Sequence, residues 1–115
     1  MRLLLVETND VNRWVGGRAG GRNVHVVPLA LMGLAADVQH RVPGTEVRIV
    51  ESSLDCPTDE AWERLLRSYQ PDLIGLRSIN FFVDEVRRLV EGAARLGPTP
   101  VILGGPIATA LGAKV

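Results

Sequence analysis

Polar or glycine-rich segments that could bind a ligand follow three of the strands expected from the sequence. They are Glu51-Ser52-Ser53, Arg77-Ser78-Ile79-Asn80 and Gly104-Gly105-Pro106-Ile107. Two adjacent glycines carry no side chains, so a flat or bulky ligand could lie directly on their backbone, and a helix starting just after them would offer N–H groups. The same pair would also suit a tight turn between a strand and a helix. The local sequence does not distinguish between a binding site and a turn.

The elements around these segments alternate between strands and helices. Short apolar runs at 3–6, 73–76 and 101–103 are typical of buried strands, and 46–50 is expected to be a further strand. Helical patterns separate the later runs. This alternation predicts a doubly wound, flavodoxin-like parallel α/β sheet, in which ligands bind outside the carboxyl ends of the strands. A segment without periodicity, from Thr8 to about Val27, is expected at the same edge and is long enough to suggest a role in function.

The helical patterns differ in how they should be buried. Residues 28–42 predict a helix with Pro28 at its first position, and its apolar residues spread around the circumference, which indicates burial on more than one side. Thr58 is expected to cap the next helix, where Trp62 belongs to a single apolar stripe and should lie in the core. Asn80 is expected to cap the third helix.

Composition excludes several functions. The 115 residues suit one domain, 1–115, and the 13 basic and 13 acidic side chains cancel, which argues against nucleic acid or an anionic membrane as a partner. A single cysteine, Cys56, cannot build a zinc or iron–sulfur site. The apolar start is too short for a signal peptide or a membrane span, so we expect a soluble, cytoplasmic protein.

Three blocks of the sequence resemble the N-terminal cobalamin (B12)-binding domain of B12-dependent radical S-adenosylmethionine (SAM) enzymes. Residues 28–36 are similar to that family's P-L-G-L-x-Y-L-A-A helix start, 71–76 to its P-D-[LV]-[IV]-G-[LI] strand, and 101–109 to its V-x-L-G-G-P-H-A-T strand and loop. The blocks occur in the family's order and at matching separations, and together cover about Pro28 to Thr109. Methionine synthase and the cobalamin mutases share the second and third patterns.

The resemblance implies that cobalamin lies across the carboxyl edge of the sheet. Carried over by position, the residues implied to line the lower face of the corrin ring are Leu76, Arg77, Ser78, Ile79 and Asn80. Those implied at the ring edge and nucleotide tail are Gly104, Gly105, Pro106 and Ile107. The chain departs from the family at two of these positions, because Arg77 stands where a serine is frequent and Ile107 where a histidine is frequent.

Two residues bear on the cobalt environment. In methionine synthase and the mutases the lower cobalt ligand is the histidine of D-x-H-x-x-G; residues 23–28 keep this histidine as His25 but lack the acid and the glycine. His25 is therefore either that ligand or an ordinary loop histidine. Arg77 would discourage axial ligation from below, since a guanidinium has no lone pair to donate; alternatively it bonds local carbonyls or Glu51. His40 is expected on the surface.

The resemblance also sets expectations for the parent protein. Catalysis cannot reside in this chain, because a radical SAM centre needs three cysteines in a C-x3-C-x2-C loop. A following domain would hold the 4Fe–4S cluster and SAM and perform methyl transfer or radical rearrangement. A flavodoxin-like sheet usually has five strands, so we expect the 115 residues to be truncated before the fifth and to bind cobalamin weakly compared with the parent.

The main alternative is a non-catalytic α/β interaction module that binds no cofactor. A four-stranded sheet would leave an unpaired outer edge, which favours a homodimer. Two other interpretations fit poorly. A receiver domain needs an aspartate where Arg77 ends the third strand, and a nicotinamide Rossmann domain needs G-x-G-x-x-G directly after the first strand.

Overall fold

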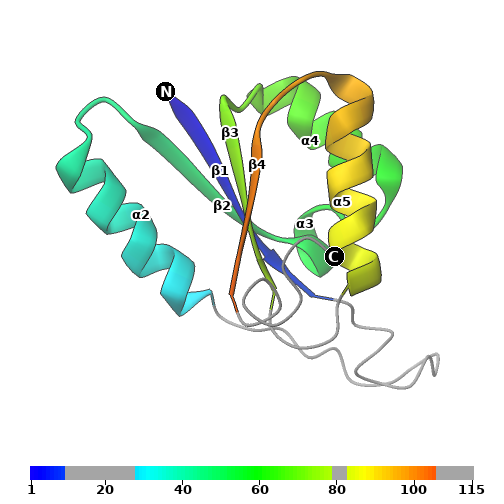
Figure 1. The fold of residues 1–115 in the computed structure, drawn as a ribbon, viewed down its shortest axis with the longest axis horizontal. Helices are drawn as coiled ribbons and strands as arrows, with labels where there is room; N and C mark the ends of the chain where they lie inside the picture. The colour runs from blue at the N-terminus through cyan, green and yellow to red at the C-terminus, as the bar shows by residue number, and fades with distance from the viewer. Residues whose placement is uncertain (10–27, 79–82, 106–115) are drawn as a thin grey trace.

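The computed structural model describes residues 1–9, 28–78 and 83–105. Its elements are β1 (Arg2–Thr8), α2 (Leu29–Arg41), β2 (Glu46–Glu51), α3 (Ser52–Asp55), α4 (Asp59–Tyr69), β3 (Leu73–Ser78), α5 (Val83–Leu96) and β4 (Val101–Gly104). The four strands form one parallel sheet in the order β2-β1-β3-β4. The predicted doubly wound α/β fold is confirmed (Figure 1).

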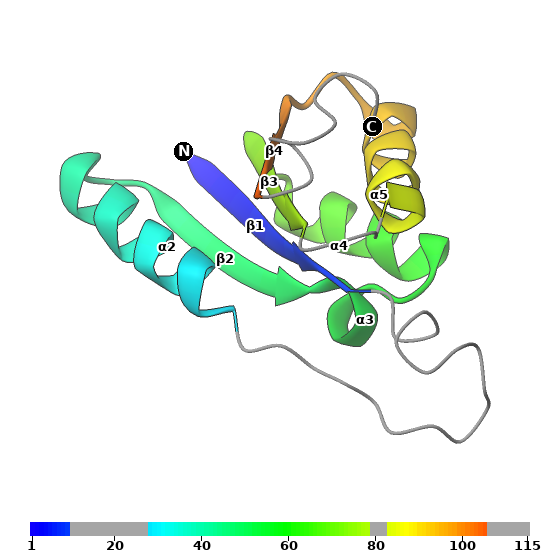
Figure 2. The ribbon, with the colours of Figure 1, turned by 60° about the horizontal axis from the view of Figure 1, so that its bottom comes forward.

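The helices divide between the two faces of the sheet. Helix α2 lies against β1 and β2 on one face, and α4 and α5 pack against each other on the opposite face (Figures 1 and 2). Because side chains alternate along a strand, each strand contributes to both faces. Leu4, Val6, Ile74 and Leu76 join the core beneath α4 and α5, whereas Leu3 and Leu5 meet α2.

Helix α4 begins and packs as its sequence predicts. The Thr58 hydroxyl accepts a hydrogen bond from the Ala61 N–H at 3.1 Å, which satisfies one of the otherwise unpaired amides of the first turn. The indole of Trp62 is fully buried, and its Nε1 donates to the Leu89 carbonyl of α5 at 2.9 Å. This bond fastens the two helices together. Asn80, the expected cap of α5, lies outside the described residues.

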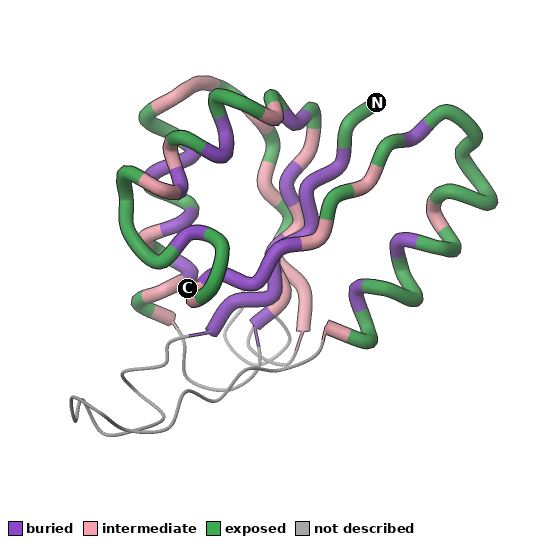
Figure 3. The backbone as a smooth tube through the Cα atoms, turned by 180° about the vertical axis from the view of Figure 1, so that it is seen from behind, coloured by how far each residue is buried: buried purple, intermediate pink, exposed green. Residues whose placement is uncertain are grey.

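Helix α2 departs from its prediction in two ways. Pro28 is the N-cap residue rather than the first helical residue, and its carbonyl accepts the first helical hydrogen bond from Met32 N. Only Leu31 and Ala35 of the helix are buried, whereas Leu29 is 70% exposed and Met32 is 50% exposed (Figure 3). The expected burial on several sides is therefore wrong for the part of the chain that the structure describes, because α2 rests on the sheet by one narrow stripe.

Strand β3 is longer than predicted. It continues through Arg77 and Ser78, which the sequence analysis placed in the following loop. The alternation of the strand separates these neighbours: Arg77 lies on the face of α2, and Ser78 lies on the face of α4 and α5. The short helix α3, which follows β2 directly, was not predicted.

Candidate functional site

Four residues form a row across the sheet near the carboxyl ends of its strands. Glu51, Glu7, Arg77 and Gly104 are register partners on β2, β1, β3 and β4. Because side chains alternate along a strand, all four lie on the sheet face that α2 covers. They are two residues farther along their strands than the apolar row that contains Leu5. The row therefore marks where this face changes from apolar to charged.

Arg77 and Glu7 form an ion pair at the centre of this row. Arg77 Nη1 lies 2.5 Å from Glu7 Oε1, and the Glu7 side chain is only 1% exposed while that of Arg77 is 28% exposed. Burial raises the pKa of Glu7, an effect opposed by the nearby Arg77 guanidinium. Among the described residues, Glu7 Oε2 has no hydrogen-bond partner. Glu7 was missed from the sequence; its signal is a charged residue that directly follows a buried apolar run.

Glu51 is held by its own neighbours. Its carboxylate accepts hydrogen bonds from the Ser53 amide at 3.1 Å and from the Ser53 hydroxyl, and its own amide donates to Asp55 at 2.8 Å. Arg77 forms its ion pair with Glu7, and Glu51 lies one strand farther away. These bonds hold the Glu51 carboxylate against the turn that follows β2.

The end of β1 is fastened to this turn. The Asn9 amide donates to Ser52 Oγ at 2.8 Å, and the Ser52 hydroxyl lies 3.1 Å from the Asn9 carbonyl. Both residues are buried. These contacts fix the carboxyl end of the strand that carries Glu7.

A cavity of about 210 Å³, here named the α2 slot, opens beside the charged row. Its floor comes from Leu5, Gly75, Ile102 and Gly104 of the sheet, and its end from Leu76, Arg77 and Gly105. Helix α2 supplies a wall of Ala30, Leu31 and Leu34. The slot exists because α2 covers β1 and β2 and because the neighbouring strands carry glycines on this face.

The two floor glycines leave different amounts of space. A Cβ added to Gly104 would meet only the Leu76 carbonyl oxygen, at 4.0 Å, so this position opens onto empty volume. A Cβ added to Gly75 would lie 2.8 Å from a methyl group of Leu5, so that space is already filled. Gly105 has a φ of 94°, and a Cβ there would lie 2.6 Å from the Ser78 carbonyl oxygen. The backbone turn therefore requires a glycine at 105.

The slot brings together some of the predicted site residues. Leu76, Arg77, Gly104 and Gly105 line it. Ser78 is buried on the other side of the sheet, and among the described residues its hydroxyl has no hydrogen-bond partner. Ile79, Asn80, Pro106, Ile107 and His25 lie outside the described residues.

Metal-binding groups are scarce in the described part of the chain. No set of three or more His, Cys, Asp or Glu side chains within 1–9, 28–78 and 83–105 is arranged to hold a metal ion. His40 is exposed on α2, as predicted. Cys56 is fully buried, and burial raises the pKa of its thiol to about 12, so it would be a poor ligand or nucleophile.

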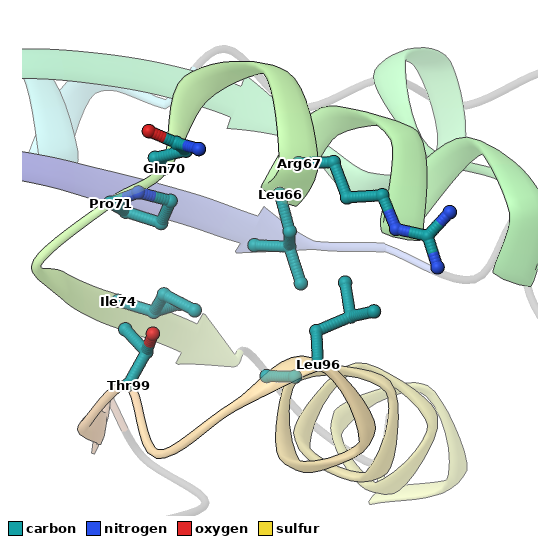
Figure 4. A pocket seen from close by; sticks show the side chains of 8 residues that line it. Leu66, Arg67, Gln70, Pro71, Ile74, Leu96 and Thr99 are labelled. Carbon is teal, nitrogen blue, oxygen red and sulfur yellow. The ribbon is translucent and has the colours of Figure 1, made fainter.

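A second cavity lies on the opposite face, near the amino end of β3. It has a volume of about 280 Å³ and lies between α4 and α5; Figure 4 shows Leu66, Ile74 and Leu96 around it, with Arg67 at its side. It contains none of the predicted site residues. Because doubly wound sheets bind ligands at the carboxyl ends of their strands, the α2 slot is the better candidate site.

Comparisons with known proteins add no family to this geometry. No protein-family model matches the chain, and a search of curated proteins finds no significant similarity. None of the described helices is long and apolar enough to cross a membrane.

Proposed function

We propose that the chain is the cobalamin-binding module of a B12-dependent radical SAM enzyme. The supporting observation is the α2 slot, an apolar cavity at the carboxyl edge of a parallel sheet, with Gly104 and Gly105 of the third family-like block at its end. This is the edge where doubly wound sheets bind ligands. The open space over Gly104 would admit one edge or one substituent of a larger ligand.

The residues of this chain would hold and orient the cofactor. Leu5, Leu34 and Ile102 offer apolar contacts, and Arg77 offers hydrogen-bond donors at the end of the slot. Cobalamin, when bound, would supply the cobalt chemistry of methyl transfer or radical rearrangement. SAM and the 4Fe–4S cluster would belong to a following domain of the parent protein, whose reading frame should encode the C-x3-C-x2-C motif.

Titration with hydroxocobalamin tests the proposal. We expect its visible spectrum to change when it is titrated into the parent protein, with weaker binding to the 115-residue chain. Gly104→Val should reduce the affinity at least tenfold, because the new side chain occupies the slot without meeting a neighbouring atom at its Cβ. Gly33→Ala is the matched control, since a Cβ at this position on α2 meets nothing within 4 Å and lies outside the slot lining.

Two results would remove the assignment. One is an unchanged spectrum with no corrin retained on gel filtration by either protein. The other is a downstream domain that lacks the cysteine motif.

The second candidate function is a protein-interaction module without a cofactor. The observation that favours it is the pair of exposed apolar side chains that line the α2 slot, Leu34 of α2 and Ile102 of β4. Apolar side chains gathered on one surface are characteristic of contacts with another protein. If cobalamin does not bind, this function becomes the better explanation of the same face.

A further inference from the structure

We infer that the α2 slot selects a neutral planar group that accepts a hydrogen bond, such as a primary carboxamide on a ring. The Glu7–Arg77 pair would exclude a carboxylate or an amidinium of the same shape. The inference rests on the proposed function in that it concerns the same slot, and it names the chemistry that the slot recognises. Cobalamin carries carboxamide side chains, so the two proposals are compatible.

The shape of the slot favours a small flat group. Gly104 leaves space above the floor, while Leu5 and Ile102 of the floor and Leu34 of the wall are apolar. Its volume of about 210 Å³ is below the roughly 300 Å³ at which pockets begin to enclose drug-sized ligands, so it would hold a small molecule or one substituent of a larger one. A single ring with one polar substituent matches this space.

The polar end of the slot offers donors. Arg77 lines the slot, is partly exposed, and uses Nη1 to bind Glu7. A guanidinium carries five N–H donors and no acceptor. A ligand group that reaches Arg77 should therefore present an oxygen or nitrogen acceptor.

The charge of the row argues against an ionic ligand. Arg77 is already paired with Glu7, so the end of the slot holds one carboxylate and one guanidinium in direct contact. An anion would add a further negative charge beside the buried Glu7. A cation would meet Arg77 at the slot end and could reach Glu7 only by displacing it. A neutral acceptor leaves the existing pair intact.

The buried state of Glu7 strengthens this selection. Its carboxylate is already disfavoured by burial, which raises its pKa. Binding a carboxylate next to it would favour uptake of a proton by Glu7. Anion binding should therefore be weak at neutral pH.

Three fragments of one shape test the inference: benzamide, benzoate and benzamidine. Each is titrated into the ¹⁵N-labelled chain at pH 7.5, and the amide resonances of Gly75 and Gly104 are followed, with Gly33 as a reference outside the slot. We expect benzamide to shift both slot resonances and the two charged fragments to bind at least tenfold more weakly. Gly104→Val should abolish all three responses.

A double variant separates recognition from folding. Glu7→Gln combined with Arg77→Gln removes both charges together, so no buried carboxylate is left without its partner, and an unchanged far-ultraviolet circular dichroism spectrum verifies the fold. In this variant the affinities for benzamide and benzoate should differ by less than threefold.

Three results would each overturn the inference. They are equal affinity of the natural chain for benzoate and benzamide, a retained difference in affinity in the folded double variant, and no response to benzamide. If hydroxocobalamin binds but the three fragments bind equally well, the inference about the slot is wrong and the cobalamin proposal stands. If benzamide is selected but hydroxocobalamin does not bind, only the cobalamin proposal is wrong.

Discussion

Glu7 is a buried acidic residue whose burial the surrounding sequence does not predict. It looks like an ordinary charged residue after an apolar run, yet it is buried between Glu51 and Arg77 on the central strand. Burial outweighs the attraction of Arg77 and raises the pKa of Glu7 above its ordinary value of 4.5. The folded state therefore holds this proton at a pH where the unfolded chain has released it.

This shift predicts how stability depends on pH. The contribution of Glu7 to the free energy of unfolding is fully present below pH 4.5 and is lost as the pH rises through the folded-state pKa. Glu7→Gln cannot ionise, so its stability relative to the natural chain should increase across that interval. Urea unfolding at several pH values between 4 and 8 measures the difference. Glu91→Gln, at an exposed position of α5, is the control. A constant difference for Glu7→Gln would contradict the predicted shift.

Residue types predicted the core better than they predicted the site. Trp62 and the Thr58 cap follow from local periodicity and capping chemistry, and the structure confirms both. The Glu7–Arg77 pair joins residues 70 positions apart, so it depends on strand register rather than local pattern. The slot likewise depends on how far α2 extends across the sheet, which the composition of α2 does not reveal.

At the scale of elements, two glycines in helices show how packing decides the effect of one methyl group. A Cβ at Gly92 of α5 would lie 2.6 Å from Cδ1 of Trp62, a rigid and fully buried ring. A Cβ at Gly33 of α2 would meet nothing within 4 Å. Replacing glycine by alanine should therefore lower the stability of the protein at position 92 and raise it at position 33.

We expect Gly92→Ala to destabilise the protein by about 1–3 kcal/mol, because the α4–α5 contact must open to admit the methyl group. Gly33→Ala should stabilise it by about 0.5–1 kcal/mol, because alanine loses less backbone entropy in a helix. Urea denaturation followed by circular dichroism at 222 nm measures both. If both variants were stabilised, the close contact between Gly92 and Trp62 would not exist in solution.

At the scale of the whole molecule, the sheet has two outer strands, β2 and β4, in the part of the chain that the structure describes. Ile102 of β4 is 57% exposed and lines the α2 slot together with Leu34 of α2, which is 47% exposed. The early turns of α2 carry no charge, since its charged pair, Asp37 and Arg41, lies in its second half. Both the strand edge and this uncharged face therefore favour association.

We expect the chain to form a dimer at high concentration, measured by sedimentation equilibrium. Ile102→Lys and Leu34→Lys should each weaken association at least tenfold if the apolar face forms the contact, because each would bury a charge. Leu54→Lys is the matched control, since Leu54 on α3 is equally exposed, at 58%, but lies outside this face. If β4 instead pairs edge to edge, its outward amides should gain hydrogen-exchange protection with concentration, whereas face-to-face contact should leave them unchanged. A strict monomer at millimolar concentration would contradict both arrangements.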